Sequence, residues 1–229
     1  MSIQNPKPKT RNSEDAPTRY ALMGFLLSLS VAATFTLTGP KHFPEAPFRP
    51  ELILDKPVPD FRLNLLVDAG KRDERMGPLS FQGKKTVVLY FLSGQCGMCR
   101  MTNPRVVRWL QSDGGRNAAL LGVRCNALDK PAEMQRWAET NHLPFPILND
   151  ERGMTSAYFQ VARTPIFAII DKRGILRYLG PFDDNLEEAE VKRRFAPDAL
   201  AAINAGQPVA VKSHVALGCA ITSLKDAVH

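Results

Sequence analysis

The sequence predicts an α/β domain in which helices flank a mixed central β-sheet. Two nearly continuous apolar runs, residues 86–92 and 118–125, have the length and composition of buried strands. Segments with a helical pattern, such as 131–141, alternate with these runs along the chain. The chain has 229 residues, 44% of them hydrophobic, which is enough for one domain with a substantial core and hardly enough for two.

The N-terminal part of the chain is expected to precede this domain. Residues 20–39 contain no charge, and a helix of that length spans roughly 30 Å, about one bilayer core. Basic residues are more frequent before this segment than directly after it, which predicts that the N-terminus stays in the cytoplasm. We therefore expect a cytoplasmic leader at 1–19, a transmembrane anchor in the lipid bilayer at 20–39, and a proline-rich linker at 40–55.

A cleaved signal peptide is the alternative for residues 20–39, because SVAA at 30–33 offers small residues for cleavage. Both alternatives place the rest of the chain in an exported compartment, where disulfides form and persist. The expected location is therefore the bacterial inner membrane, crossed once, with the domain in the periplasm. Cleavage would instead leave a soluble periplasmic protein.

The elements of the domain follow from local patterns along residues 56–206. A helix should begin near Cys96, directly after a buried strand, and Pro104 should kink it. Pro131 is placed at the first turn of another helix, and Gly206 is placed to end the last one. In order, the predicted elements are a strand within 60–70, a turn at 78–85, the strand 86–92, a helix from Cys96 to Gln111, the strand 118–125, the helix 131–141, an extended piece at 145–150, the helix 152–161, the antiparallel strands 166–171 and 175–180, and the helix 196–206.

Cys96 and Cys99 form a Cys-x-x-Cys pair at the point where a buried strand passes into a helix. Backbone N–H groups and the helix dipole favour a thiolate there and so lower the pKa of Cys96, and Arg100 adds a positive charge nearby. Cys99 lies one helical turn later, close enough to close a small disulfide ring. One activated thiol with a second thiol behind it is the arrangement that thiol–disulfide exchange requires.

A metal site is a weaker interpretation of the same thiols. Zinc would need a second Cys-x-x-Cys or a pair of histidines, and the remaining cysteines and histidines have no such spacing. Met98 and Met101 flank the thiols, and Cys with Met suits Cu(I), so a Cu(I)-binding thiol protein is a third hypothesis. The leading expectation is no metal and no cofactor beyond a redox-active Cys96–Cys99 disulfide.

An ordered set of motifs resembles the thioredoxin-like redoxins, which include membrane-anchored TlpA-like thiol–disulfide oxidoreductases and peroxiredoxin-like AhpC/TSA proteins. The resemblance implies a thioredoxin fold in which Cys96 is the attacking thiol and Cys99 the resolving thiol. It also implies that the Thr164–Pro165 bond is cis, faces the cysteines and helps to dock the substrate. The motifs are KPVPDFRLNLL at 56–66, FQGKKTVVLYF at 81–91, CGMC at 96–99, RTPIFAIID at 163–171 and RGILRYLGPFDD at 173–184.

Four residues near the cysteine pair bear on how it would work. Gly97 and Met98, between the cysteines, are expected to contact the substrate and to tune the reduction potential. Gln95 stands where thioredoxin has a tryptophan, and Tyr90 stands where thioredoxin has a buried aspartate. Without that carboxylate as proton acceptor, the direction of electron flow does not carry over from thioredoxin.

A peroxiredoxin-like thiol peroxidase is the second hypothesis. Peroxiredoxins place Pro, then Thr or Ser, seven and three residues before the peroxidatic cysteine. Ser93 fits the second position relative to Cys96, but Leu89 occupies the first. Arg163 is a candidate guanidinium partner for a peroxide.

The other two cysteines are candidate auxiliary thiols. Cys125 ends a predicted strand, and its simplest interpretation is a small buried residue. Cys219 lies in the extension 207–229, which is expected to pack back onto the domain. Cys219 is predicted either to pair with Cys125 in a structural disulfide or to act as an additional resolving thiol.

The sequence therefore predicts a membrane-tethered thiol–disulfide oxidoreductase. Its expected partners are exported proteins that carry thiols or disulfides, together with an electron donor in the membrane. The net charge of +7 arises from basic residues scattered among acidic ones, which argues against nucleic acid as a partner.

Overall fold

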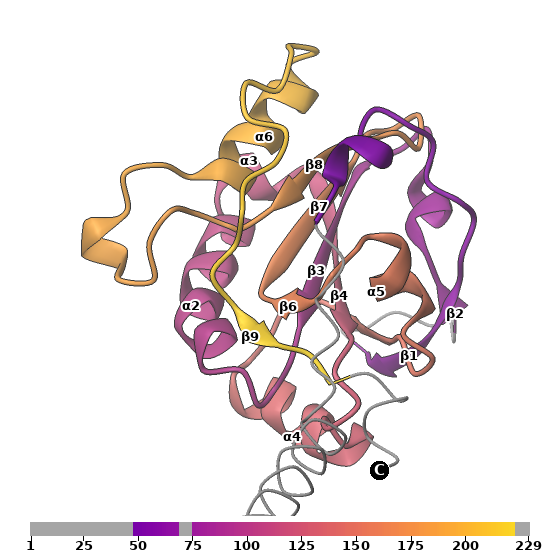
Figure 1. Ribbon diagram of the computed structural model, residues 1–229, viewed down its shortest axis with the longest axis vertical. Helices are drawn as coiled ribbons and strands as arrows, with labels where there is room; N and C mark the ends of the chain where they lie inside the picture. The colour runs from indigo at the N-terminus through magenta and orange to yellow at the C-terminus, as the bar shows by residue number, and fades with distance from the viewer. Residues whose placement is uncertain (1–47, 69–74, 223–229) are drawn as a thin grey trace, which may run out of the picture. The chain divides into compact units, whose positions relative to one another are not determined.

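A computed structural model describes residues 48–68 and 75–222, which form an α/β domain around a mixed sheet (Figure 1). The sheet has seven strands in the order β2-β1-β5-β4-β3-β7-β8. Its strands are β1 (Leu63–Val67), β2 (Arg75–Met76), β3 (Thr86–Leu92), β4 (Ala118–Arg124), β5 (Ile147–Asn149), β7 (Ile166–Ile170) and β8 (Leu176–Gly180). The helices are α2 (Gly97–Gln111), α3 (Asp113–Arg116), α4 (Pro131–Thr140), α5 (Met154–Tyr158) and α6 (Phe195–Asn204). Two short strands, β6 (Arg163–Thr164) and β9 (Cys219–Ala220), form a separate two-stranded sheet.

The centre of the sheet follows from the two apolar runs. Every residue of β3 and of β4 is buried, as expected for strands covered on both faces. β3 pairs in parallel with β4 and antiparallel with β7, and β8 continues the antiparallel side. The predicted thioredoxin-like fold, with a mixed sheet flanked by helices, is confirmed.

Successive residues of β3 face two different cores, because side chains alternate along a strand. Tyr90 belongs to the core that includes residues of α2, α4 and α6, called the first core below. Its ring stacks on that of Phe167 with 4.4 Å between centroids. Phe91 belongs to the core on the opposite face of the sheet, called the second core below, together with Phe159 at the end of α5. The cysteine pair therefore lies on the face of the sheet covered by the larger helices.

The structure adds detail to several elements that local patterns predicted. α2 is assigned as one helix from Gly97 to Gln111 with Pro104 in its interior, where the proline lacks the N–H for one backbone hydrogen bond. The predicted extended piece 145–150 contains β5, which pairs in parallel with β4. Within the predicted linker, a 3₁₀ turn at Pro50–Leu52 leads into apolar residues that pack on the second core.

The predicted leader at 1–19, the predicted anchor at 20–39 and the linker as far as residue 47 lie outside the described residues, as do 69–74 and 223–229. Within 48–68 and 75–222, no helix has the length and apolar character needed to cross a membrane.

Candidate active site

Cys96 occupies the N-cap of α2, directly after the turn that follows β3. Its Sγ accepts a hydrogen bond from the Cys99 backbone N–H at 3.3 Å, one of the N–H groups that a helix leaves unpaired at its first turn. Cys96 is 2% exposed and Cys99 is fully buried beneath it. The pair thus lies at a strand-to-helix junction, as the sequence predicted.

The loop between α5 and β7 approaches Cys96 from the other side. The Thr164–Pro165 peptide bond is cis, as the resemblance implied. Cys96 Sγ lies 3.2 Å from the carbonyl oxygen of Thr164, and Thr164 is fully buried. Two of the predicted substrate-binding residues therefore adjoin the predicted nucleophile.

The two thiols of the pair differ in acidity. A hydrogen bond from the Cys99 thiol, with a further one from the Cys219 thiol, lowers the pKa of Cys96 to about 4 against the opposing effect of burial. Burial, together with the neighbouring Cys96 sulfur, raises the pKa of Cys99 well above its ordinary value. Arg100, which the sequence predicted to add a positive charge nearby, donates through Nη2 to the Gly94 carbonyl at 3.1 Å in the turn before Cys96. Hydrogen bonds from neighbouring thiols and from the helix N-terminus therefore favour the Cys96 thiolate.

This difference predicts a distinctive pH dependence of alkylation. Above its pKa Cys96 is a thiolate, so its rate of reaction with iodoacetamide should change little between about pH 6 and pH 8. An ordinary cysteine, with a pKa near 8.5, should instead react about tenfold faster for each pH unit in this range. Peptide-level mass spectrometry of the reduced protein measures each rate, with Cys99 and Cys125 as internal controls that stay slow. A tenfold rise per unit at Cys96 would contradict the assignment.

Tyr90 lies below the pair in place of the aspartate of thioredoxin. Its hydroxyl donates to Asn103 Oδ1 at 2.6 Å in the buried interior. Burial, and the nearby Cys99 sulfur, raise the pKa of Tyr90 well above its ordinary value. Tyr90 is therefore a neutral donor at physiological pH and takes no proton from the cysteines.

A buried carboxylate that sequence reasoning missed holds the turn before Cys96. Asp129 Oδ1 accepts hydrogen bonds from the Ser93 hydroxyl at 3.0 Å and from the Gln95 backbone N–H at 3.3 Å. Burial raises the pKa of Asp129, and the bond from Ser93 opposes this. The detectable signal was the polar stretch NALD directly after a predicted strand, since polar side chains there meet the end of the neighbouring parallel strand.

The same bond bears on the peroxidase hypothesis. Ser93 is the residue that matched a peroxiredoxin position, and its hydroxyl is directed to Asp129. Leu89, at the other motif position, is fully buried in the second core. The described contacts therefore give Ser93 a structural role in the turn.

The two auxiliary cysteines lie in different surroundings. Cys125 is buried, its Sγ lies 3.7 Å from the carbonyl oxygen of Leu92, and burial raises its pKa. Cys219 is half-buried, and its Sγ lies 2.7 Å from Cys96 Sγ. All four cysteines are free thiols, so the Cys125–Cys219 disulfide considered from the sequence is not formed. Of the two alternatives for Cys219, its position fits that of an additional thiol at the redox pair.

The remaining predicted residues surround the pair. Gly97 is exposed, and a Cβ at this position would meet no atom within 4 Å, which leaves open space beside Cys96. Met98 is half-buried against the first core, while Met101 is 42% exposed. In the described part of the chain, no group of three or more His, Cys, Asp or Glu residues is arranged to hold a metal ion.

Two known proteins resemble the chain in sequence. The thioredoxin-like protein YneN of Bacillus subtilis is 31% identical over 121 residues, which cover 52% of this chain and 66% of that protein. The chain thus spans just under two thirds of YneN. The thiol:disulfide interchange protein DsbE of Xylella fastidiosa is 26% identical over 163 residues, 71% of this chain and 78% of that protein.

A solved structure, of an uncharacterized conserved protein from Geobacillus kaustophilus, matches with a TM-score of 0.63 at 24% identity. The match covers 74% of this chain and 91% of that protein, and it shows a shared fold. Residues 54–179, more than half of the chain, match the AhpC/TSA family. This match includes Cys96, Cys99 and the cis-proline loop, and confirms the resemblance to the redoxins. The chain therefore belongs to the AhpC/TSA family.

Proposed function

We propose that this protein is a thiol–disulfide oxidoreductase that exchanges disulfides with cysteine-bearing proteins through Cys96 and Cys99. The observation that carries the proposal is the position of Cys96 Sγ. This sulfur accepts a hydrogen bond from the Cys99 backbone N–H at the start of α2. It also lies 3.2 Å from the Thr164 carbonyl oxygen beside the cis-proline. The similarity to a thioredoxin-like protein and to a thiol:disulfide interchange protein supports the same activity.

Reduction of a client disulfide proceeds in two exchange steps. The Cys96 thiolate attacks one client sulfur, forms a mixed disulfide and releases the other client sulfur as a thiolate. Cys99 then loses its proton and attacks Cys96 Sγ, which releases the second client thiolate and leaves the Cys96–Cys99 disulfide. Two electrons pass from the dithiol to the client, and the client thiolates take up the protons. The reverse sequence oxidises a client dithiol.

The change of charge at Cys96 prepares Cys99 for the second step. The Cys96 sulfur is among the causes that raise the pKa of Cys99. Once Cys96 is part of a mixed disulfide it carries no charge, so this cause disappears and the pKa of Cys99 falls. The backbone of Ser93 also acts to lower the pKa of Cys99. Cys99 therefore stays a protonated, unreactive thiol before the mixed disulfide forms, and it loses its proton more readily afterwards.

The client is proposed to bind along the cis-proline loop. A pocket of about 260 Å³ adjoins Pro165 and is bordered by Thr102 of α2 and by Phe182. Gly97 leaves the space beside Cys96 open, so a client backbone can approach the thiol closely. Tethering through residues 20–39 in an exported compartment, with an electron donor in the membrane, completes the proposal and is supported by the charge-free run in the sequence.

A trapping experiment tests this function. The double variant Cys99→Ser/Cys219→Ser retains Cys96 but has neither neighbouring thiol to resolve a mixed disulfide. Incubated with a disulfide-bearing protein such as insulin, it should accumulate a Cys96-linked conjugate that dithiothreitol releases. The matched control, with Cys96→Ser added, should give none. If neither protein forms a conjugate while the parent consumes peroxide steadily, the exchange function fails and the peroxidase hypothesis takes its place.

A further inference from the structure

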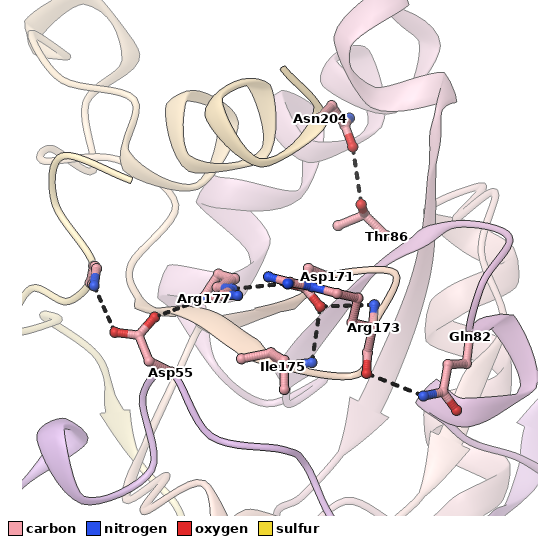
Figure 2. Close-up of polar contacts among 9 residues, drawn as sticks. Asp55, Gln82, Thr86, Asp171, Arg173, Ile175, Arg177 and Asn204 are labelled. Carbon is pink, nitrogen blue, oxygen red and sulfur yellow. Dashed lines mark hydrogen bonds and ion pairs between the residues drawn. The ribbon is translucent and has the colours of Figure 1, made fainter. Parts of the chain in front are cut away.

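The C-terminal tail, defined here as residues 212–222, runs back across the domain to β9, which lies beside β6 (Figure 1). Its beginning is anchored at Lys212. The Leu179 backbone N–H donates to the Lys212 carbonyl at 3.0 Å, and Lys212 Nζ donates to Asp55 Oδ2 at 2.6 Å. Asp55 is held in turn by Arg177, whose Nη1 donates to Asp55 Oδ1 at 2.8 Å (Figure 2).

The end of the tail forms a β-strand on the cis-proline loop. β9 pairs antiparallel with β6, with Thr164 opposite Cys219 and Arg163 opposite Ala220. The Ile221 N–H donates to the Ala162 carbonyl at 3.0 Å, which extends the pairing by one residue. Backbone pairing to an exposed strand edge is a common way for a protein to bind an extended peptide. The tail therefore occupies the edge on which the proposed client would lie.

The register of this pairing brings Cys219 to the nucleophile. Its Sγ lies 2.7 Å from Cys96 Sγ, although the two residues are 123 positions apart in the sequence. Gly218 permits this approach, since a Cβ there would lie 2.8 Å from the Thr164 carbonyl oxygen and 2.9 Å from Arg163 Cβ. A side chain at position 218 is therefore incompatible with the observed seating of the tail.

Backbone pairing and a few partly buried side chains hold the tail. Two of its apolar side chains, Val215 and Leu217, are 77% and 71% exposed and border the pocket beside Pro165, whereas Ala216 and Ile221 pack on the second core. Releasing β9 uncovers Cys219 and Ile221, which are only partly buried, and breaks its backbone bonds to β6, to Ala162 and to Ala127. A segment held in this way can leave the edge and return to it.

We infer that the tail is a tethered pseudosubstrate, which occupies the client-binding edge and presents Cys219 to Cys96 to form an internal mixed disulfide. This inference rests on the proposed exchange function. It assigns Cys219 the position that a client cysteine takes, and it makes the tail a competitor of clients. Because the tail is part of the same chain, its effective concentration at the site is high. It can therefore compete with a client even if its intrinsic affinity for the edge is no greater than the client's.

The internal exchange needs no external oxidant once the pair is oxidised. The Cys219 thiol gives up its proton, and its sulfur attacks Cys96 Sγ in the Cys96–Cys99 disulfide. The Cys96–Cys219 bond forms, the Cys96–Cys99 bond breaks, and Cys99 leaves as a thiolate that takes up one proton. One disulfide is present before and after the step. Attack by Cys99 on Cys96 Sγ reverses it, and the tail is then free to move away from the edge.

The first test seeks the internal disulfide directly in the full-length chain. Cys99→Ser protein is treated with oxidised glutathione, which places glutathione on Cys96 and releases one reduced glutathione. Cys219 should then displace the second glutathione, so that peptide mapping finds Cys96 linked to Cys219. The control Cys99→Ser/Cys219→Ser should instead retain glutathione on Cys96. Retention of glutathione in both proteins would overturn the internal disulfide.

The second test measures competition between tail and client. Gly218→Val should unseat β9, and the rate of insulin reduction should rise at least about fivefold because the binding edge is freed. Ala220→Val adds the same side chain at an exposed position of β9 and should leave the rate at that of the parent. Equal rates in all three proteins would overturn the pseudosubstrate.

The two tests separate this inference from the proposed function. If insulin is reduced equally by all three proteins and no Cys96–Cys219 link forms, the tail inference fails while the exchange function stands. If no protein reduces insulin, the exchange function fails, and the glutathione experiment still decides whether the Cys96–Cys219 link forms.

Discussion

Replacing Cys96 with Ser should lower the rate of exchange with a disulfide-bearing client by at least about a thousandfold. The thiolate is the attacking species, and the surroundings of Cys96 lower its pKa to about 4. A serine hydroxyl at the same N-cap would accept the same backbone hydrogen bond, so α2 should form normally, but it would remain protonated and unreactive. Insulin reduction, with dithiothreitol as electron source, measures the loss.

Cys125→Ala is the matched control for that experiment. Cys125 is buried, and its Sγ contacts the Leu92 carbonyl at 3.7 Å rather than the redox pair, so exchange should proceed at close to the parent rate. Circular dichroism of both variants shows whether the fold is retained. If the Cys96→Ser protein keeps more than about a tenth of the parent rate, another cysteine is the attacking thiol.

Replacing Asp183 with Ala should lower the free energy of unfolding by about 3–5 kcal/mol, because it leaves a buried positive charge without its partner. Arg105 lies on α2, and its side chain is 8% exposed. Its Nε lies 2.8 Å from Asp183 Oδ2, and its Nη2 donates to Asp183 Oδ1 at 3.1 Å. The pair fixes the helix that carries the cysteines to the loop after β8. Urea denaturation measures the change.

Glu187→Ala provides the control, since Glu187 is an exposed carboxylate in the same loop. Its removal should change the free energy of unfolding by no more than about 0.5 kcal/mol. A similar small change for Asp183→Ala would mean that Arg105 is sufficiently satisfied by its bonds to the backbone carbonyls of Asn185 and Leu186.

The sequence was sufficient for the centre of the fold because that centre is encoded locally. The run TVVLYFL is a strand at Thr86–Leu92, and the helix begins after Cys96 as the strand-to-helix boundary indicated. The short strands β6 and β9 were not predicted, because each has two residues and exists only through pairing with the other. No periodic pattern can develop over two residues, so such pairing is visible only in three dimensions.

The site was predictable to the same extent. The Cys-x-x-Cys pair and the cis Thr164–Pro165 bond followed from motifs whose order along the chain is specific. Asp129 was missed because its role depends on a hydrogen bond to Ser93, across a separation of 36 residues. The choice between two positions for Cys219 could not be made from an even number of cysteines, and it depends on the register of β9 against β6.

The sequence separation between Cys96 and Cys219 has a consequence for the stability of the oxidised protein. A Cys96–Cys99 disulfide closes a ring of only a few residues, so it restricts the unfolded chain very little. A Cys96–Cys219 disulfide would link residues 123 positions apart and restrict most of the domain. In the chain-entropy description the difference between the two amounts to about 3 kcal/mol of unfolding free energy. Each form contains one disulfide, so the two are equally oxidised. The form with the Cys96–Cys219 disulfide would nevertheless be the more resistant to heat and proteolysis. Such resistance would preserve the oxidised protein between encounters with clients.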